Sequence, residues 1–142
     1  MKSAKTARQS KTPKTTRQLD AEIADHQERA RLSARVQKIL DKWQPILGIA
    51  VREFRIKKMR AFASLNLAER RMWVSQALAK MSPRDLEYVV LHELVHLLVG
   101  EEEGSGHDPR FYALMDRYLP GWRRTHRRLR SGDVVARDLP GM

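Results

Sequence analysis

The stretch Tyr88-Val89-Val90-Leu91-His92-Glu93-Leu94-Val95-His96-Leu97-Leu98-Val99 holds two histidines and a glutamate inside an otherwise apolar run. Residues four positions apart lie on one face of a helix, so both imidazoles can reach a single metal ion. Glu93 stands beside them, where a carboxylate can take the proton of a metal-activated water. The pattern predicts a helix that carries two ligands and the general base of a zinc hydrolase.

A histidine on an apolar helix is more often a buried core residue than a metal ligand. Here, however, His92, Glu93 and His96 interrupt one helix that is apolar nearly all round, and such a helix is normally buried. Burying a glutamate without a compensating partner costs several kcal/mol. A metal site explains why the chain keeps all three polar residues.

Local signals mark the ends of this helix and of the next one. Ser82 is a suitable N-cap, Pro83 suits the first helical position, and Gly100 is a typical C-terminal stop. Asp108 and Pro109 repeat the same start for a second helix, which Pro120-Gly121 ends. The predicted buried face of this second helix contains Phe111, Leu114, Met115 and Tyr118.

The residues upstream predict a helix followed by short strands. A helix is expected over residues 19–43, with Pro45 as its stop, and strands are expected over 49–56, 61–67 and 71–78. Short connections favour an antiparallel meander, whose edge strand 71–78 would bind an extended substrate. We therefore expect an α+β fold: an N-terminal helix, a three-stranded antiparallel sheet, the metal-binding helix and a following helix that completes the site.

A catalytic zinc ion takes three protein ligands and leaves one position open for water. The metzincin pattern is excluded, because it would place glycine where this chain has Val99 and histidine where it has Glu102. The remaining candidates for the third ligand are Glu101, Glu102, Glu103 and His107. We favour His107, because the capped helix start that follows it would fix its position.

The charge of the chain indicates a class of partner: 28 Lys and Arg against 17 Asp and Glu give a net charge of +11, which favours a polyanion such as nucleic acid. We expect residues 1–18 to form a disordered basic arm, 19–130 the folded domain, and 131–142 a flexible tail. The candidate nucleic-acid contacts are Lys2, Lys5, Arg8, Lys11, Lys14, Arg17, Arg123, Arg124, Arg127, Arg128 and Arg130.

The cysteine count and the lengths of the apolar runs indicate the cellular compartment of the protein. The chain has no cysteine, so any zinc must be held by histidine and carboxylate, and a reducing, cytoplasmic location is expected. No run of 18 or more apolar residues is present, and the N-terminal segment has no apolar core of the kind that a secretory signal needs. We therefore expect no membrane partner. The sequence does not indicate an oligomeric state.

The sequence also resembles a known family, the YgjP-like metal-dependent hydrolases, which are close to the SprT-like zinc metallopeptidases. The likeness rests on the stretch Tyr88 to Leu97, then His107, Phe111, Tyr112, Pro120 and Trp122. It covers about residues 49–129, although the stretch 97–106 is longer than is usual in the family. The resemblance implies a small zincin-like domain, zinc ligation by His92, His96 and His107, and Glu93 as the catalytic acid and base.

We therefore expect a zinc-dependent metallopeptidase that acts on peptide bonds and that its basic ends recruit to nucleic acid. One rival is a zinc-dependent hydrolase of nucleic acid, which the charge would suit. The other is a non-enzymatic nucleic-acid-binding module with a relict metal site. Glu93 argues against this second rival, because a purely structural metal site needs no base beside its ligands.

Overall fold

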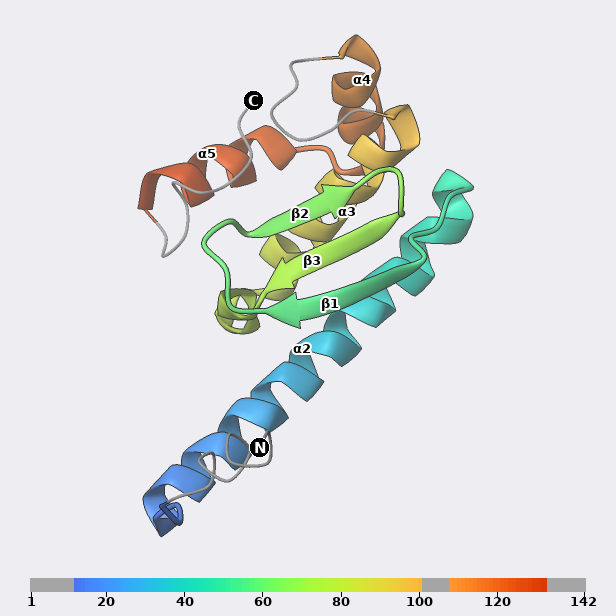
Figure 1. The fold of residues 1–142 in the computed structure, drawn as a ribbon. Coiled ribbons are helices and arrows are strands. Elements are labelled where there is room, and N and C mark those ends of the chain that lie inside the picture. Colours follow the sequence, from blue (N-terminus) through green and yellow to red (C-terminus); the bar gives the residue numbers. More distant parts are fainter. Residues whose placement is uncertain (1–11, 101–107, 133–142) are drawn as a thin grey trace.

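The computed structural model describes residues 12–100 and 108–132 (Figure 1). Its elements, in chain order, are α2 (Thr16–Leu47), β1 (Glu53–Lys57), β2 (Ala63–Asn66), β3 (Arg71–Ser75), the 3₁₀ helix η2 (Gln76–Lys80), α3 (Pro83–Val99), α4 (Pro109–Tyr118) and α5 (Trp122–Gly132). The expected α+β class is confirmed. No helix in the described ranges is both long and apolar enough to cross a membrane.

Helix α2 extends beyond its predicted range at both ends. Thr15 Oγ1 accepts the N–H of Gln18 (3.1 Å), and Gln18 Oε1 accepts the N–H of Thr15 (2.7 Å), which forms a capping box. The helix thus includes the last residues of the segment expected to be an arm. The predicted stop at Pro45 was wrong, because a proline in the last turn removes only one intrahelical hydrogen bond. The helix ends at Gly48, whose φ of 70° is left-handed.

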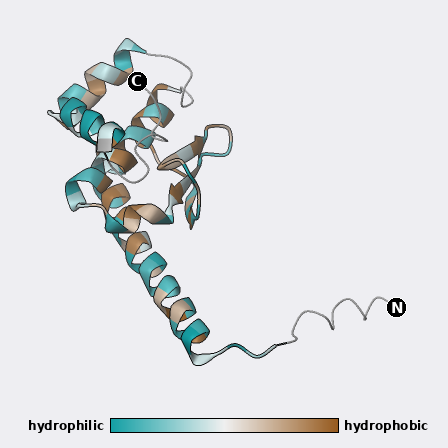
Figure 2. Cartoon of the chain, turned by 90° about the vertical axis from the view of Figure 1, so that its left-hand side faces the viewer, coloured by the Kyte–Doolittle hydropathy of each residue, from teal (hydrophilic) through white to brown (hydrophobic). Residues whose placement is uncertain are grey.

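Only the C-terminal half of α2 belongs to the core. Its buried residues begin at Leu32 and continue at helical spacing with Val36, Leu40, Trp43 and Leu47. The first turns of the helix project away from the rest of the fold (Figure 2). The indole of Trp43 donates to Glu87 Oε2 on α3 (2.7 Å), so the buried half of α2 is attached to the helix that carries the candidate site.

The sheet is mixed, and the predicted antiparallel arrangement was wrong. The strand order is β1-β3-β2, with β1 parallel and β2 antiparallel to β3. After β1 the chain crosses the end of β3. Ser75 fixes this crossing, because its N–H donates to Phe62 O (2.9 Å) and its hydroxyl donates to Met59 O (3.2 Å). The strand predicted over 71–78 is consequently the central one, and it ends early where η2 begins.

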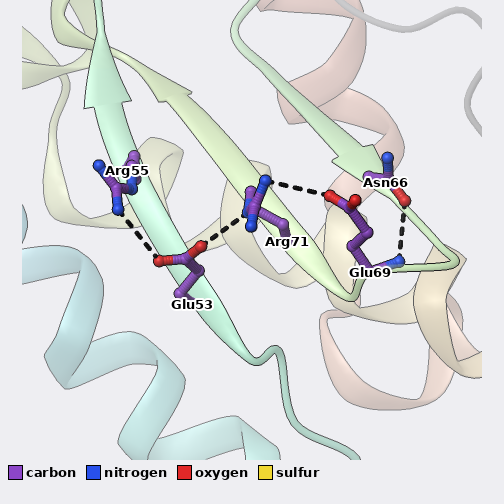
Figure 3. A network of polar contacts seen from close by, with 5 residues as sticks. All are labelled: Glu53, Arg55, Asn66, Glu69 and Arg71. Atoms are coloured by element: carbon purple, nitrogen blue, oxygen red, sulfur yellow. Dashed lines mark hydrogen bonds and ion pairs between the residues drawn. The ribbon is translucent and has the colours of Figure 1, made fainter.

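One face of the sheet packs on the helices, and the other carries charged side chains around Trp73. Alternation along β3 places Met72 and Val74, both 0% exposed, in the core. On the opposite face, Arg71 Nε donates to Glu53 Oε2 (2.7 Å), and Arg71 Nη1 lies 3.0 Å from Glu69 Oε1 (Figure 3). Since the apolar face includes β2, which contacts α3, the sheet covers one side of the site helix.

The site helix has the predicted bounds, and one further helix was not predicted. Ser82 Oγ accepts the N–H of Asp85 (3.2 Å) at the start of α3, and Gly100 ends it with a φ of 76°. Asp108 caps α4 as expected, by accepting the N–H of Arg110 (2.8 Å). α5 was missed: it follows α4 and packs against α3 through its own buried side chains. Those side chains are Trp122, Thr125, His126 and Leu129.

Candidate metal centre

The two histidines of the H-E-x-x-H stretch lie side by side inside the fold. His92 is 1% exposed and His96 is 5% exposed, and their ring centroids are 4.7 Å apart at an interplanar angle of 82°. Phe111 of α4 packs against both rings: its ring centroid lies 5.1 Å from that of His92 and 4.5 Å from that of His96. α3 and α4 together therefore hold the two imidazoles on one face of α3, as the spacing predicted.

Glu93 is enclosed next to them. Glu93 is only 1% exposed, and its Oε2 lies 3.7 Å from His92 Nδ1. Burial lowers the pKa of His92 to about 3, so this imidazole is neutral near pH 7. The contact between His92 and Glu93 is accordingly one between a neutral ring and a carboxyl group.

His92 Nε2 fits the position of a metal ligand. It is buried and has no hydrogen-bond partner among the described residues. A buried polar atom of this kind normally costs free energy unless something binds it. Metal coordination requires the neutral imidazole with a lone pair on one nitrogen, which is the form that burial imposes here. The donor set at this place therefore suits a metal ion.

The third ligand lies outside the described residues. His107 and the three glutamates Glu101, Glu102 and Glu103 all fall between the two described ranges. Across residues 12–100 and 108–132, no three His, Cys, Asp or Glu side chains gather in a way that could hold a metal ion. Asp108, which directly follows His107, is fixed as the N-cap of α4. The choice of His107 as third ligand stays a prediction.

A second polar pair next to the site was not predicted. Tyr88, one helical turn before His92, and His126 of α5 are both buried, and Tyr88 Oη lies 2.7 Å from His126 Nδ1. The sequence signal for His126 was its helical spacing with Trp122 and Leu129, which indicates a buried face within the arginine-rich segment. The high charge of that segment hides this apolar spacing.

The basic residues predicted to contact nucleic acid differ in whether an acidic side chain already pairs with them. Arg123 donates to Asp116 Oδ1 (2.6 Å), and Arg128 is paired with Asp85. In the N-terminal group, Lys14 is paired with Glu22, and Arg17 is exposed on the first turn of α2. The exposed arginines of α5 without an acidic partner in the described ranges are Arg124, Arg127 and Arg130. The residues that lie outside those ranges are Lys2, Lys5, Arg8 and Lys11.

Comparison with family models identifies the domain. A model described as "YgjP-like, metallopeptidase domain" matches residues 1–132. The chain belongs to this family. The likeness inferred from the H-E-x-x-H stretch is thereby confirmed, and for this YgjP-like protein the family implies a metal ion and peptide substrates. No curated protein matches the chain.

Two solved structures share the fold of this YgjP-like domain. The metallopeptidase zymogen of Pyrococcus abyssi abylysin matches with a TM-score of 0.58 and 21% identity, over 66% of this chain and 90% of that one. The metallopeptidase zymogen of Methanocaldococcus jannaschii jannalysin matches with a TM-score of 0.52 and 17% identity, over 59% and 81%. Both likenesses concern the fold alone.

Proposed function

We propose that this protein is a zinc-dependent peptidase whose metal is held by His92, His96 and His107. The observation that carries the proposal is the buried pair of imidazoles, with ring centroids 4.7 Å apart, beside the enclosed carboxylate of Glu93. Zinc is favoured because a set of three imidazoles with an open fourth position suits a catalytic zinc ion.

Each residue has a separate task in this mechanism. When bound, zinc lowers the pKa of a coordinated water and polarises the scissile carbonyl. The Glu93 carboxylate accepts the proton of the attacking water and then passes it to the leaving amide nitrogen. Phe111, packed on both histidine rings, keeps bulk water away from their inner side and limits their rotation.

The substrate strand is proposed to bind along β2. Residues 71–78, predicted from the sequence to be the substrate-binding edge strand, cannot have this role, because β3 is central and both its edges are already hydrogen-bonded. β2 is an outer strand of the sheet and contacts α3. Its open edge offers backbone donors and acceptors to an extended peptide, which main-chain hydrogen bonds would hold in place.

Direct assays separate this function from its rivals. We expect the zinc-loaded protein to cleave members of a mixed peptide library, detected by mass spectrometry, and to leave single-stranded RNA intact. A chelator should stop the cleavage and added zinc should restore it. Cleavage of RNA with intact peptides would favour the nucleic-acid hydrolase instead. No cleavage of either would favour the binding module.

Recruitment to nucleic acid is a second proposal, supported by the arrangement of α5. One side of the helix is buried through Trp122 and Leu129, and the opposite side carries arginines. Because Arg124 and Arg127 have no acidic partner in the described part of the chain, they remain available to neutralise phosphates. Arg123 and Arg128 are already paired, with Asp116 and Asp85.

This difference in pairing gives a matched comparison. Replacing both Arg124 and Arg127 by glutamine should weaken binding to single-stranded DNA and lower the magnitude of the salt slope of log K by roughly 1.4, from about 0.7 per phosphate contact on a single strand. The double variant Arg123→Gln/Arg128→Gln should change the slope less. Fluorescence anisotropy at several salt concentrations measures both. Equal slopes for the two double variants and the wild type would exclude α5 as the binding surface.

A further inference from the structure

Tyr88 connects α5 to the proposed metal site. It lies one turn before His92 on α3, is 0% exposed, and its Oη is 2.7 Å from Nδ1 of His126, which is 6% exposed. Burial lowers the pKa of His126 to about 4 and raises the pKa of Tyr88, so both groups are neutral near pH 7. A buried hydrogen bond between two neutral groups fixes the orientation of each ring.

The ring of Tyr88 is also one wall around His92. The two ring centroids are 5.4 Å apart with an interplanar angle of 49°. The rings of His96 and Phe111 also pack against His92, with centroids 4.7 Å and 5.1 Å from its own. Behind Tyr88, the indole of Trp122 stacks at 6.4 Å with an interplanar angle of 7°. His92 therefore cannot rotate toward Tyr88 unless Tyr88 moves, and Trp122 and His126 restrain that movement.

We propose that Tyr88 and His126 are positioning residues, which hold the imidazole of His92 in the orientation that a metal ion requires. The inference rests on the proposed metal site and adds a part of α5 to it. Neither residue acts as a ligand in this proposal. Their effect is preorganisation: a ligand that is already oriented binds metal more tightly, because less rotational freedom is lost on binding.

Three variants and one control test the pair. Tyr88→Phe removes the hydroxyl and keeps the ring, His126→Leu removes the partner nitrogen, and His126→Asn places an amide near the position of Nδ1. Tyr118→Phe is the control for removing a tyrosine hydroxyl away from the site, since Tyr118 is half-buried and packs on Trp43, with ring centroids 5.7 Å apart. Zinc affinity is measured by competition with a chelator, and melting temperature is measured with and without zinc.

We expect Tyr88→Phe and His126→Leu each to weaken zinc binding by about 10-fold, the lower end of the effect of outer-shell groups. The double variant should be no weaker than either single variant, and His126→Asn should restore most of the affinity. Tyr118→Phe should leave it unchanged. A fall in melting temperature with unchanged zinc affinity would overturn the proposal, because the pair would then only stabilise the fold. Multiplying effects in the double variant would also overturn it.

A measurement on the metal-free protein separates this proposal from the proposed function. In zinc-free wild type and in Tyr118→Phe, the ring resonances of His92 in an NMR spectrum should form a single sharp set. In Tyr88→Phe they should broaden or split, because the ring is released. A wild-type protein that binds no zinc would sink the metal site, but the NMR result would still decide whether Tyr88 positions His92. Unchanged His92 resonances in Tyr88→Phe would refute the positioning role.

Discussion

Replacing Glu93 by glutamine is expected to lower peptide hydrolysis by about 10²–10⁴-fold, the usual contribution of a positioned acid–base group. Glutamine keeps the size and polarity of the side chain, but it cannot accept the proton of the attacking water. Zinc content should not change, because Glu93 is not a proposed ligand. The measurement is the initial rate on one peptide from the cleaved set, together with metal analysis of the same sample.

Glu87→Gln is the matched control for this experiment. Glu87 is on the same helix, but its carboxylate accepts from Lys42 Nζ (2.8 Å) and from the indole of Trp43 (2.7 Å) on the side facing α2. Its replacement should leave turnover close to that of the wild type. If Glu93→Gln is as active as Glu87→Gln, the general-base mechanism is wrong.

Removing either described histidine should abolish zinc binding. The purified wild type is expected to hold about one zinc per chain, and His92→Ala and His96→Ala to hold none, because a site with one remaining described ligand cannot retain the ion. His107→Ala should weaken binding strongly. Metal analysis after dialysis, followed by a chelator titration, gives both content and affinity.

The exposed His26 of α2 serves as the control, and His26→Ala should bind zinc like the wild type. The third ligand is tested in the same series. Full zinc affinity in His107→Ala, together with loss of affinity on replacing a glutamate among Glu101, Glu102 and Glu103, would move the third ligand to that loop.

The site helix could be predicted from sequence because its signals are local. Ser82, Pro83 and Gly100 define its ends through capping and backbone conformation, which depend on residues within one turn. The shared face of His92 and His96 follows directly from helical geometry. The structure places the two histidine rings side by side as that geometry requires, and their role as metal ligands stays a prediction.

The order of the strands could not be predicted in this way. An alternation of apolar and polar residues, as in β1, does not state which neighbour a strand takes. The crossing after β1 depends on hydrogen bonds from Ser75 to Met59 and Phe62, which are tertiary contacts. His126 could not be distinguished for a different reason: its helical spacing with Trp122 and Leu129 is present in the sequence, but it lies among five arginines, whose charge is typical of a solvated segment.

The mixed sheet also has a consequence for the order in which its three strands are expected to pair during folding. β2 and β3 are joined by the turn 67–70, so their antiparallel pairing closes a very short loop. The parallel pairing of Glu53 with Arg71 brings together residues with the whole of β2 between them in the chain. Since the entropy cost of closure rises with loop length, we expect the β2–β3 hairpin to form before β1 docks onto it. β2, the proposed substrate edge, then belongs to the part of the sheet that we expect to assemble first.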